Sequence, residues 1–248
     1  MRPSVARRGG FGRRSLRPAP DGAPYGARSD AAEVRRKQGA SRRALLLAAA
    51  LAAIRARSAA ATGALRLVAL GDSLTAGLGL PLEASFPVLL QHALADKGVA
   101  AQIANAGVSG DTAEDGLARL DWSVPQGTQG VILELGANDA LRGMPPAGCE
   151  KALDAIITKL LDRRIAVLLC GMYAPRNLGT DYVAGFDGIY PRLAAKYGLD
   201  LYPFFLDGVA GDGSLTQPDG LHPNAAGVRA IVAKILPVVQ QFTAKLAA

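Results

Sequence analysis

Between residue 64 and the C-terminus, short apolar runs alternate with longer stretches of helical period. The apolar runs span residues 65–70, 99–104, 131–135 and 165–170, with a weaker fifth at 199–202. They are almost continuously apolar, which is typical of strands buried on both faces of a parallel sheet. The alternation therefore predicts a single α/β domain, in which two layers of helices enclose a parallel five-stranded sheet.

The stretches between these runs predict helices over residues 86–97, 113–120, 149–163, 182–197 and 225–246. Two cysteines fall at element ends, with Cys149 at the start of a helix and Cys170 at the end of a strand. Both places lie at one edge of a parallel sheet, so the sequence allows one disulfide, and two separate buried thiols are an equal alternative. Neither cysteine belongs to a C-x-x-C metal or redox motif.

Polar clusters follow three of the predicted strands. They occupy residues 71–73, 105–112 and 136–139, and a fourth cluster, PDGLHPN at 218–224, precedes the last helix. In open parallel sheets, ligands bind at the carboxyl ends of the strands. Four clusters of Gly, Asn, Asp and Ser converging on this edge therefore predict a functional site there.

The first cluster opens the segment GDSLTAGLG, and such a turn holds either a bound phosphate or a nucleophile. The segment matches neither G-x-x-x-x-G-K-[ST] nor G-x-G-x-x-G, the two common phosphate-binding patterns. Asp72 would also repel a phosphate at the helix N-terminus that should attract one. A nucleophile is the favoured interpretation, and a non-catalytic small-ligand or phosphate-binding module is the alternative.

A nucleophile needs a general base, and the chain contains only two histidines. His92 lies within a predicted helix with no acid placed to orient it. His222 follows Asp219 by three residues, a spacing that lets the carboxylate accept from Nδ1 and leaves Nε2 to take a hydroxyl proton. We therefore predict His222 as the base and Asp219 as the group that orients it.

Ser73 is the favoured nucleophile because it follows a buried strand directly and begins a predicted helix. Ser109, in a second loop at a strand end, is the competing candidate. No G-x-S-x-G motif surrounds Ser73, so the usual α/β-hydrolase arrangement is not expected.

An oxyanion hole needs hydrogen-bond donors aimed at one point from different sides. The candidates are the backbone N–H groups of Ser73 and Gly110 and the side-chain amide of Asn138. For Gly110 or Asn138 taken alone, an ordinary turn role would be the better interpretation. We predict that Asp111 caps a helix and that Asp139 braces a loop.

Together these residues resemble the four sequence blocks of the SGNH (GDSL) hydrolase family: GDSL from Gly71, Gly110, G-x-N-D from Gly136, and D-x-x-H from Asp219. The stretches NAGVSGDT, LARLDW, ELGANDALRG, PFFLDGVAG and DGLHPNAAG resemble its arylesterase, thioesterase I and lysophospholipase branch in particular. The resemblance covers about residues 65–240.

The resemblance implies a flavodoxin-like sheet and a serine esterase with Ser73, His222 and Asp219 as its triad. Ser73, Gly110 and Asn138 would bind the oxyanion. Small-molecule esters are the expected substrates: aryl esters, short or medium acyl esters, acyl thioesters and lysophospholipids. No metal or organic cofactor is expected. Loops at Leu78, 141–146 and 175–182 are expected to shape the acyl pocket.

The formal net charge of +7 is concentrated at the N-terminus. Residues 1–61 carry 14 of the 28 basic and 3 of the 21 acidic residues, so residues 62–248, the predicted hydrolase domain, are mildly acidic. Nucleic-acid binding is therefore not expected.

The composition of residues 1–40 predicts a disordered basic extension. A signal peptide normally lies at the extreme N-terminus, so one hypothesis is that translation starts downstream, at Val34. In residues 41–61, the pair Arg42-Arg43 precedes 11 apolar residues and a small-residue end at Ala61. This pattern resembles a twin-arginine signal peptide and predicts export to the periplasm or beyond, without stable membrane insertion, because a bilayer span needs about 20 apolar residues. A basic arm followed by a short helix is the alternative.

Overall fold

A single parallel sheet forms the centre of the protein. The computed structural model describes residues 63–247, which lie in one compact unit, and the predicted extension 1–40 and signal peptide 41–61 fall outside the described residues. The strands are β1 (Leu65–Gly71), β2 (Ala101–Gly107), β3 (Gly130–Glu134), β4 (Ala166–Cys170) and β5 (Asp200–Tyr202). They pair in the order β2-β1-β3-β4-β5, all parallel, which confirms the predicted flavodoxin-like sheet.

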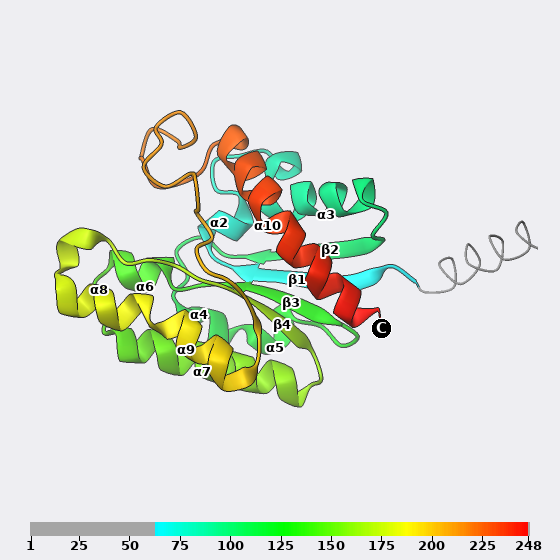
Figure 1. Cartoon of the computed structure of the whole chain (residues 1–248), viewed down its shortest axis with the longest axis horizontal. Coiled ribbons are helices and arrows are strands. Elements are labelled where there is room, and N and C mark those ends of the chain that lie inside the picture. The colour runs from blue at the N-terminus through cyan, green and yellow to red at the C-terminus, as the bar shows by residue number, and fades with distance from the viewer. Residues whose placement is uncertain (1–62, 248) are drawn as a thin grey trace, which may run out of the picture. The chain divides into compact units, whose positions relative to one another are not determined.

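Helices cover both faces of this sheet (Figure 1). One layer consists of α2 (Ser73–Ala76), α3 (Phe86–Asp96) and α10 (Ala225–Leu246). The other holds α4 (Ala113–Ala118), α5 (Leu120–Ser123), α6 (Ala137–Leu141), α7 (Pro146–Asp162), α8 (Thr180–Asp187) and α9 (Ile189–Tyr197). Two 3₁₀ turns, η1 (Leu82–Ala84) and η2 (Arg176–Leu178), lie in connecting loops. The three predicted layers are therefore present.

Several element boundaries differ from the sequence prediction: the helix predicted over residues 149–163 begins at Pro146, and the one predicted over 113–120 is divided into α4 and α5. The second strand is predicted over residues 99–104 but extends from Ala101 to Gly107. It is an edge strand whose second half is largely exposed, so the apolar residues that mark a strand end before the strand does. The helix predicted over residues 182–197 is two helices, which meet at Gly188. Pro191 has no backbone N–H to donate, so it is better accommodated in the first turn of a new helix than inside a continuous one.

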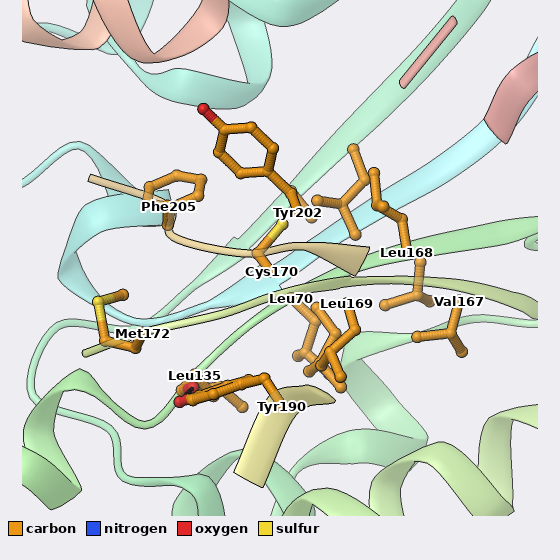
Figure 2. Close-up of a cluster of buried hydrophobic side chains, with 14 of the residues drawn as sticks. Leu70, Leu135, Val167, Leu168, Leu169, Cys170, Met172, Tyr190, Tyr202 and Phe205 are labelled. Carbon is orange, nitrogen blue, oxygen red and sulfur yellow. Dashed lines mark hydrogen bonds between the residues drawn. The ribbon is translucent and has the colours of Figure 1, made fainter. Parts of the chain in front are cut away.

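The core contains both cysteines as free, buried thiols. Cys170 points to the same side of the sheet as Tyr202 and Phe205, whereas Tyr190 packs on the opposite side (Figure 2). Cys149 lies in α7, in the layer on that opposite side. Because the sheet separates the two cysteines, the structure contains two separate thiols and no disulfide between them.

Helix α10 is long and apolar enough to cross a membrane by length and composition alone, with a mean hydropathy of 1.2. It packs against α3, β4 and β5. Its buried residues include Val228, Ile231, Ile235 and Val239. The packing of α10 against the sheet and α3 therefore explains why one face of this helix is apolar.

The chain reverses direction across the sheet between β1 and β3, since β2 lies on one side of β1 and β3 on the other. At such a switch point the loops that leave the two strands diverge to opposite faces and open a crevice at the carboxyl edge. The segments that follow β1, β2 and β3 contain Ser73 at the start of α2, Gly110 in a loop, and Asn138 in α6. The topology thus brings the three predicted oxyanion donors to one edge.

Candidate active site

Ser73, His222 and Asp219 form a continuous hydrogen-bonded chain, although 149 residues separate the serine from the histidine. Ser73 Oγ lies 2.9 Å from His222 Nε2, and His222 Nδ1 lies 2.6 Å from Asp219 Oδ2. The serine is buried at 8% exposure, while the Asp219 side chain remains 44% exposed. The three residues that the sequence predicts to act together are thus in hydrogen-bond contact.

Local backbone geometry presents Ser73 at the end of β1. Asp72 caps α2, with its Oδ1 accepting from Leu74 N at 3.0 Å, so the helix starts at Ser73 itself. The turn needs a glycine at position 71 because Thr75 and Glu134 leave no space for a side chain there. A Cβ at Gly71 would clash with Thr75 Oγ1 and would lie 2.6 Å from both the backbone oxygen and Oε2 of Glu134. A larger residue would therefore displace these groups or shift the turn that holds the serine.

The loop that carries His222 is held by Asp219 and by Gln217. Asp219 Oδ1 accepts from Leu221 N at 2.9 Å and from His222 N at 3.0 Å. Gln217 N donates to His222 O at 2.7 Å, and its side-chain amide donates to Leu78 O, in the loop after α2, at 2.7 Å. Gln217 therefore ties the histidine loop to the segment that follows the serine.

Asp219 stays ionised across the neutral pH range. The hydrogen bond from His222 is the main cause that lowers the pKa of Asp219 to about 2, and the amides of His222 and Leu221 add to it. An ionised carboxylate accepts from Nδ1, so the imidazole hydrogen sits on Nδ1 and Nε2 is left as an acceptor facing Ser73.

Two of the predicted oxyanion donors are backbone groups without a hydrogen-bond partner among residues 63–247: the N–H of Ser73 and that of Gly110. Gly110 has a φ of +91°, in the left-handed region that favours glycine. The third donor, Asn138, lies on α6, and its Nδ2 donates to Asp72 Oδ2 at 3.1 Å and to the Asp111 carbonyl at 3.0 Å. Both amide hydrogens are engaged, so a substrate oxyanion would compete with the Asp111 carbonyl for one of them.

Two buried carboxyl groups lie beneath the serine. Burial is the largest cause that raises the pKa of Asp72 to about 6, against hydrogen bonds from Leu74 and Asn138 that lower it. Burial also raises the pKa of Glu134 well above its usual range, and the nearby Asp72 charge raises it further. Glu134 Oε2 accepts from Thr75 Oγ1 at 2.7 Å, and Asp72 Oδ2 accepts from Asn138 Nδ2 at 3.1 Å, which orients that amide.

The raised pKa of Asp72 predicts a pH dependence of stability. Its folded-state value of about 6 lies above the 3.8 of an unperturbed aspartate, so the folded state binds this proton more tightly than the unfolded state. The free energy of unfolding should therefore fall as pH rises from about 4 to about 7, by on the order of 3 kcal/mol from this group. Denaturant unfolding at both pH values measures the fall, and Asp72→Asn should remove that share. An unchanged pH difference in the variant would contradict the prediction.

A cavity of about 470 Å³ opens beside Ser73 and His222. Its walls are mainly apolar and come from α6 and the loops after β4 and β5: Leu141, Met172, Tyr173, Pro175, Phe204 and Leu206. The rings of Tyr173 and Phe204 stack with centroids 4.5 Å apart. Arg176 lies over Tyr173, 5.3 Å from its ring centroid, and forms an ion pair with Asp187 at 2.6 Å.

The sequence located only part of this cavity. Of the predicted pocket segments, Leu141, Pro175 and Arg176 line it. Leu78 instead borders a narrow crevice that Ser73 and His222 also touch. Met172, Tyr173, Phe204 and Leu206 were missed because apolar residues that line a cavity have the same sequence pattern as apolar residues of the core.

The competing candidates lie apart from the hydrogen-bonded chain. His92 is exposed on α3, and Ser109 is exposed in the loop after β2 without a hydrogen bond to His222. Asp139 braces the site as predicted, because its Oδ2 accepts from Ala113 N at 2.9 Å and joins the loops after β2 and β3.

The prediction that Asp111 caps a helix is wrong. Thr112 caps α4, and Asp115 completes a capping box with it. The Asp111 carboxylate instead forms an ion pair with Arg119, whose side chain is almost fully buried. An aspartate just before a helix can either cap that helix or pair with a distant arginine. The local sequence is the same in both cases, so only the tertiary structure shows which role Asp111 has.

Across residues 63–247 there is no group of three or more His, Cys, Asp or Glu side chains arranged to bind a metal ion.

Comparison with known proteins places this chain in a family. Residues 69–230 match the model of the GDSL-like lipase/acylhydrolase family. The chain is 39% identical to the esterase TesA of Pseudomonas aeruginosa over 199 residues, which cover 80% of this chain and 98% of the relative. It is 41% identical to an arylesterase of Vibrio mimicus over 167 residues, which cover 67% of this chain and 84% of the relative.

A solved structure gives the same result. AlinE4, described as an SGNH-hydrolase family esterase, aligns with a TM-score of 0.62 at 44% identity, over 73% of this chain and 97% of AlinE4. The order of strands in the sheet agrees with these similarities. The chain belongs to the GDSL-like lipase/acylhydrolase family, the SGNH hydrolases.

Proposed function

We propose that this ester hydrolase cleaves carboxylic esters through an acyl-enzyme on Ser73, with His222 as general base and Asp219 orienting it. The single observation that carries the proposal is the hydrogen-bonded chain in which Ser73 Oγ lies 2.9 Å from Nε2 and Nδ1 lies 2.6 Å from Asp219. A nucleophile, a base and an orienting acid within hydrogen-bond reach are what covalent catalysis by serine requires.

In the first half-reaction, Ser73 Oγ attacks the ester carbonyl carbon while His222 Nε2 takes the hydroxyl proton. The carbonyl oxygen becomes an oxyanion, which accepts from Ser73 N, Gly110 N and Asn138 Nδ2. The bond to the leaving oxygen then breaks, and the imidazolium gives its proton to the departing alcohol. An acyl-enzyme remains.

In the second half-reaction, a water molecule takes the place of the alcohol. His222 removes its proton as the water oxygen attacks the acyl carbon, and the same three donors bind the second oxyanion. The acyl bond to Oγ breaks, Ser73 recovers a proton from the imidazolium, and the carboxylic acid leaves.

The cavity supports aryl esters or short and medium acyl esters as substrates. Its volume of about 470 Å³ falls within the usual range for small-molecule sites, and its apolar walls suit an aromatic ring or a short hydrocarbon chain. Acyl thioesters and lysophospholipids share the same reactive carbonyl chemistry and are the further substrates to test.

A panel of nitrophenyl esters from acetate to palmitate, beside phenyl acetate and an acyl thioester, tests this proposal. We expect the highest kcat/KM for the phenyl and short to medium acyl esters, with a decline once the chain exceeds the cavity. Cleavage of none of these compounds would contradict the proposal and favour a non-catalytic small-ligand module.

Asn138→Ala should lower kcat by about 10²–10³-fold with little change in KM, the usual cost of removing one oxyanion donor. The loss is expected in kcat because the amide turns from the Asp111 carbonyl to the oxyanion only as charge develops. Steady-state kinetics on a nitrophenyl ester measures both constants. A kcat within a few-fold of the wild-type value would return Asn138 to an ordinary turn role.

We also propose that the protein is exported, on the basis of the twin-arginine-like pattern in residues 41–61. The intact mass of the protein from its own host tests this. A mature chain starting near residue 62 is expected, and a chain that retains residues 41–61 would contradict export by cleavage.

A further inference from the structure

We propose that Arg119 is a positioning residue that fixes the geometry of the oxyanion hole, an inference that rests on the proposed esterase function. Arg119 lies at the junction of α4 and α5 and is only 7% exposed. It does not line the cavity beside Ser73. Its guanidinium instead lies behind the loops that leave β1 and β2.

Four of the five N–H groups of the Arg119 guanidinium donate hydrogen bonds to neighbouring groups. Nε donates to Asp111 Oδ2 at 2.5 Å, Nη1 donates to Ala106 O and to Ser123 Oγ at 2.9 Å each, and Nη2 donates to Gly71 O at 2.8 Å. A buried cation is tolerated only when it is paired and hydrogen-bonded, and Asp111 and the two carbonyls meet that condition.

The contacts of Arg119 with Gly71, Ala106 and Asp111 lead to the two proposed backbone oxyanion donors. The Gly71 carbonyl belongs to the turn that presents the Ser73 N–H, two residues later. Ala106 and Asp111 bracket the loop that contains Gly110, so the guanidinium holds both ends of it. Among the contacts described above, no other side chain joins the β1 turn to both ends of this loop.

The third donor is reached through Asp111. Its carboxylate pairs with Arg119 while its carbonyl accepts from Asn138 Nδ2 at 3.0 Å. A shift of Asp111 would therefore turn the amide of Asn138 as well. Arg142 also contacts this loop, donating to the Gly110 carbonyl at 2.7 Å, but it does so from the exposed side.

A lysine cannot replace this arrangement. Its ammonium is a single point on a flexible stem and cannot present planar donors to three separate segments at once. Arg119→Lys keeps the positive charge opposite Asp111 but releases at least one of the carbonyls. The Arg119→Lys variant therefore tests the effect of the hydrogen bonds to the two carbonyls separately from the effect of the positive charge.

The experiment compares Arg119→Lys with Arg66→Lys as the matched control. Arg66 also donates to a backbone carbonyl, that of Gly127, but at the amino end of β1, away from the site. Active sites are counted by titration with a fluorophosphonate, and kcat and KM are measured per titrated site at a temperature at which all variants are folded.

We expect Arg119→Lys to lower kcat on the order of 10²-fold at nearly constant KM, because small displacements of positioned groups carry losses of that size. The rate of inactivation by the fluorophosphonate should fall in parallel. Arg66→Lys should leave both rates unchanged per site. An Arg119→Lys kcat within threefold of wild type, with only a lower Tm, would overturn the inference.

Asp111→Asn keeps the inference testable if Arg119→Lys does not fold. A neutral acceptor holds the guanidinium less strongly, so we expect a loss in kcat of about tenfold with KM unchanged. An unchanged kcat per titrated site would overturn the inference. A wild-type protein that neither cleaves esters nor reacts with the fluorophosphonate would instead refute the proposed function itself.

Discussion

Replacing Ser73 with alanine is expected to lower kcat on the order of 10⁶-fold, because the variant has no oxygen to form the acyl-enzyme. The oxyanion donors and the cavity stay in place, so substrate binding should persist while turnover falls to the residual level that those donors supply. Initial rates on a nitrophenyl ester at high enzyme concentration measure the loss.

Ser109→Ala is the matched control for this variant. Ser109 is the other serine at a strand end of the site, and it is exposed and not bonded to His222. Its replacement should leave kcat within a few-fold of wild type. Activity that survives in Ser73→Ala and disappears in Ser109→Ala would transfer the role of nucleophile to Ser109.

Asp219→Asn is expected to lower kcat by about 10⁴-fold, because it reverses the tautomer of His222. Asp219 Oδ1 accepts from the backbone N–H groups of Leu221 and His222, so the amide oxygen of the variant should keep that place. The amide NH₂ then occupies the Oδ2 position and donates to Nδ1. The imidazole hydrogen moves to Nε2, which can no longer accept the proton of Ser73.

Asp212→Asn tests whether this effect is specific. Asp212 lies in the same long loop and accepts from the N–H and hydroxyl of Ser214, without contact to His222. Its replacement should leave kcat unchanged. A loss of less than tenfold in Asp219→Asn, measured with KM on the same ester, would mean that Asp219 does not set the tautomer.

The carboxyl edge of the sheet could be predicted because the signals that define it are local. Buried strands leave continuous apolar runs, and the residues after β1, β2 and β3 must meet at one edge whatever the details of the loops. That reasoning placed Ser73, Gly110 and Asn138 together. His222 followed from the shortage of histidines and from the three-residue spacing to Asp219.

The remaining features depend on tertiary contacts that leave no local pattern. An arginine in a helix reads as a surface residue, yet Arg119 is buried because three separate segments supply its acceptors. Glu134 ends an apolar strand, and its pKa is raised because the surrounding fold buries the carboxyl group. The cavity walls after β4 and β5 depend on contacts between separate segments, such as the stacking of Tyr173 on Phe204, and neither segment shows such a contact in its own sequence.

The central claim is that Ser73 is the nucleophile that His222 activates, and peptide mass spectrometry after labelling with a fluorophosphonate tests it most directly. The wild-type protein should carry one phosphonyl group on the peptide that contains Ser73, and Asp219→Asn should acquire it far more slowly. Labelling of another serine, or no adduct in a protein that cleaves esters, would contradict the account.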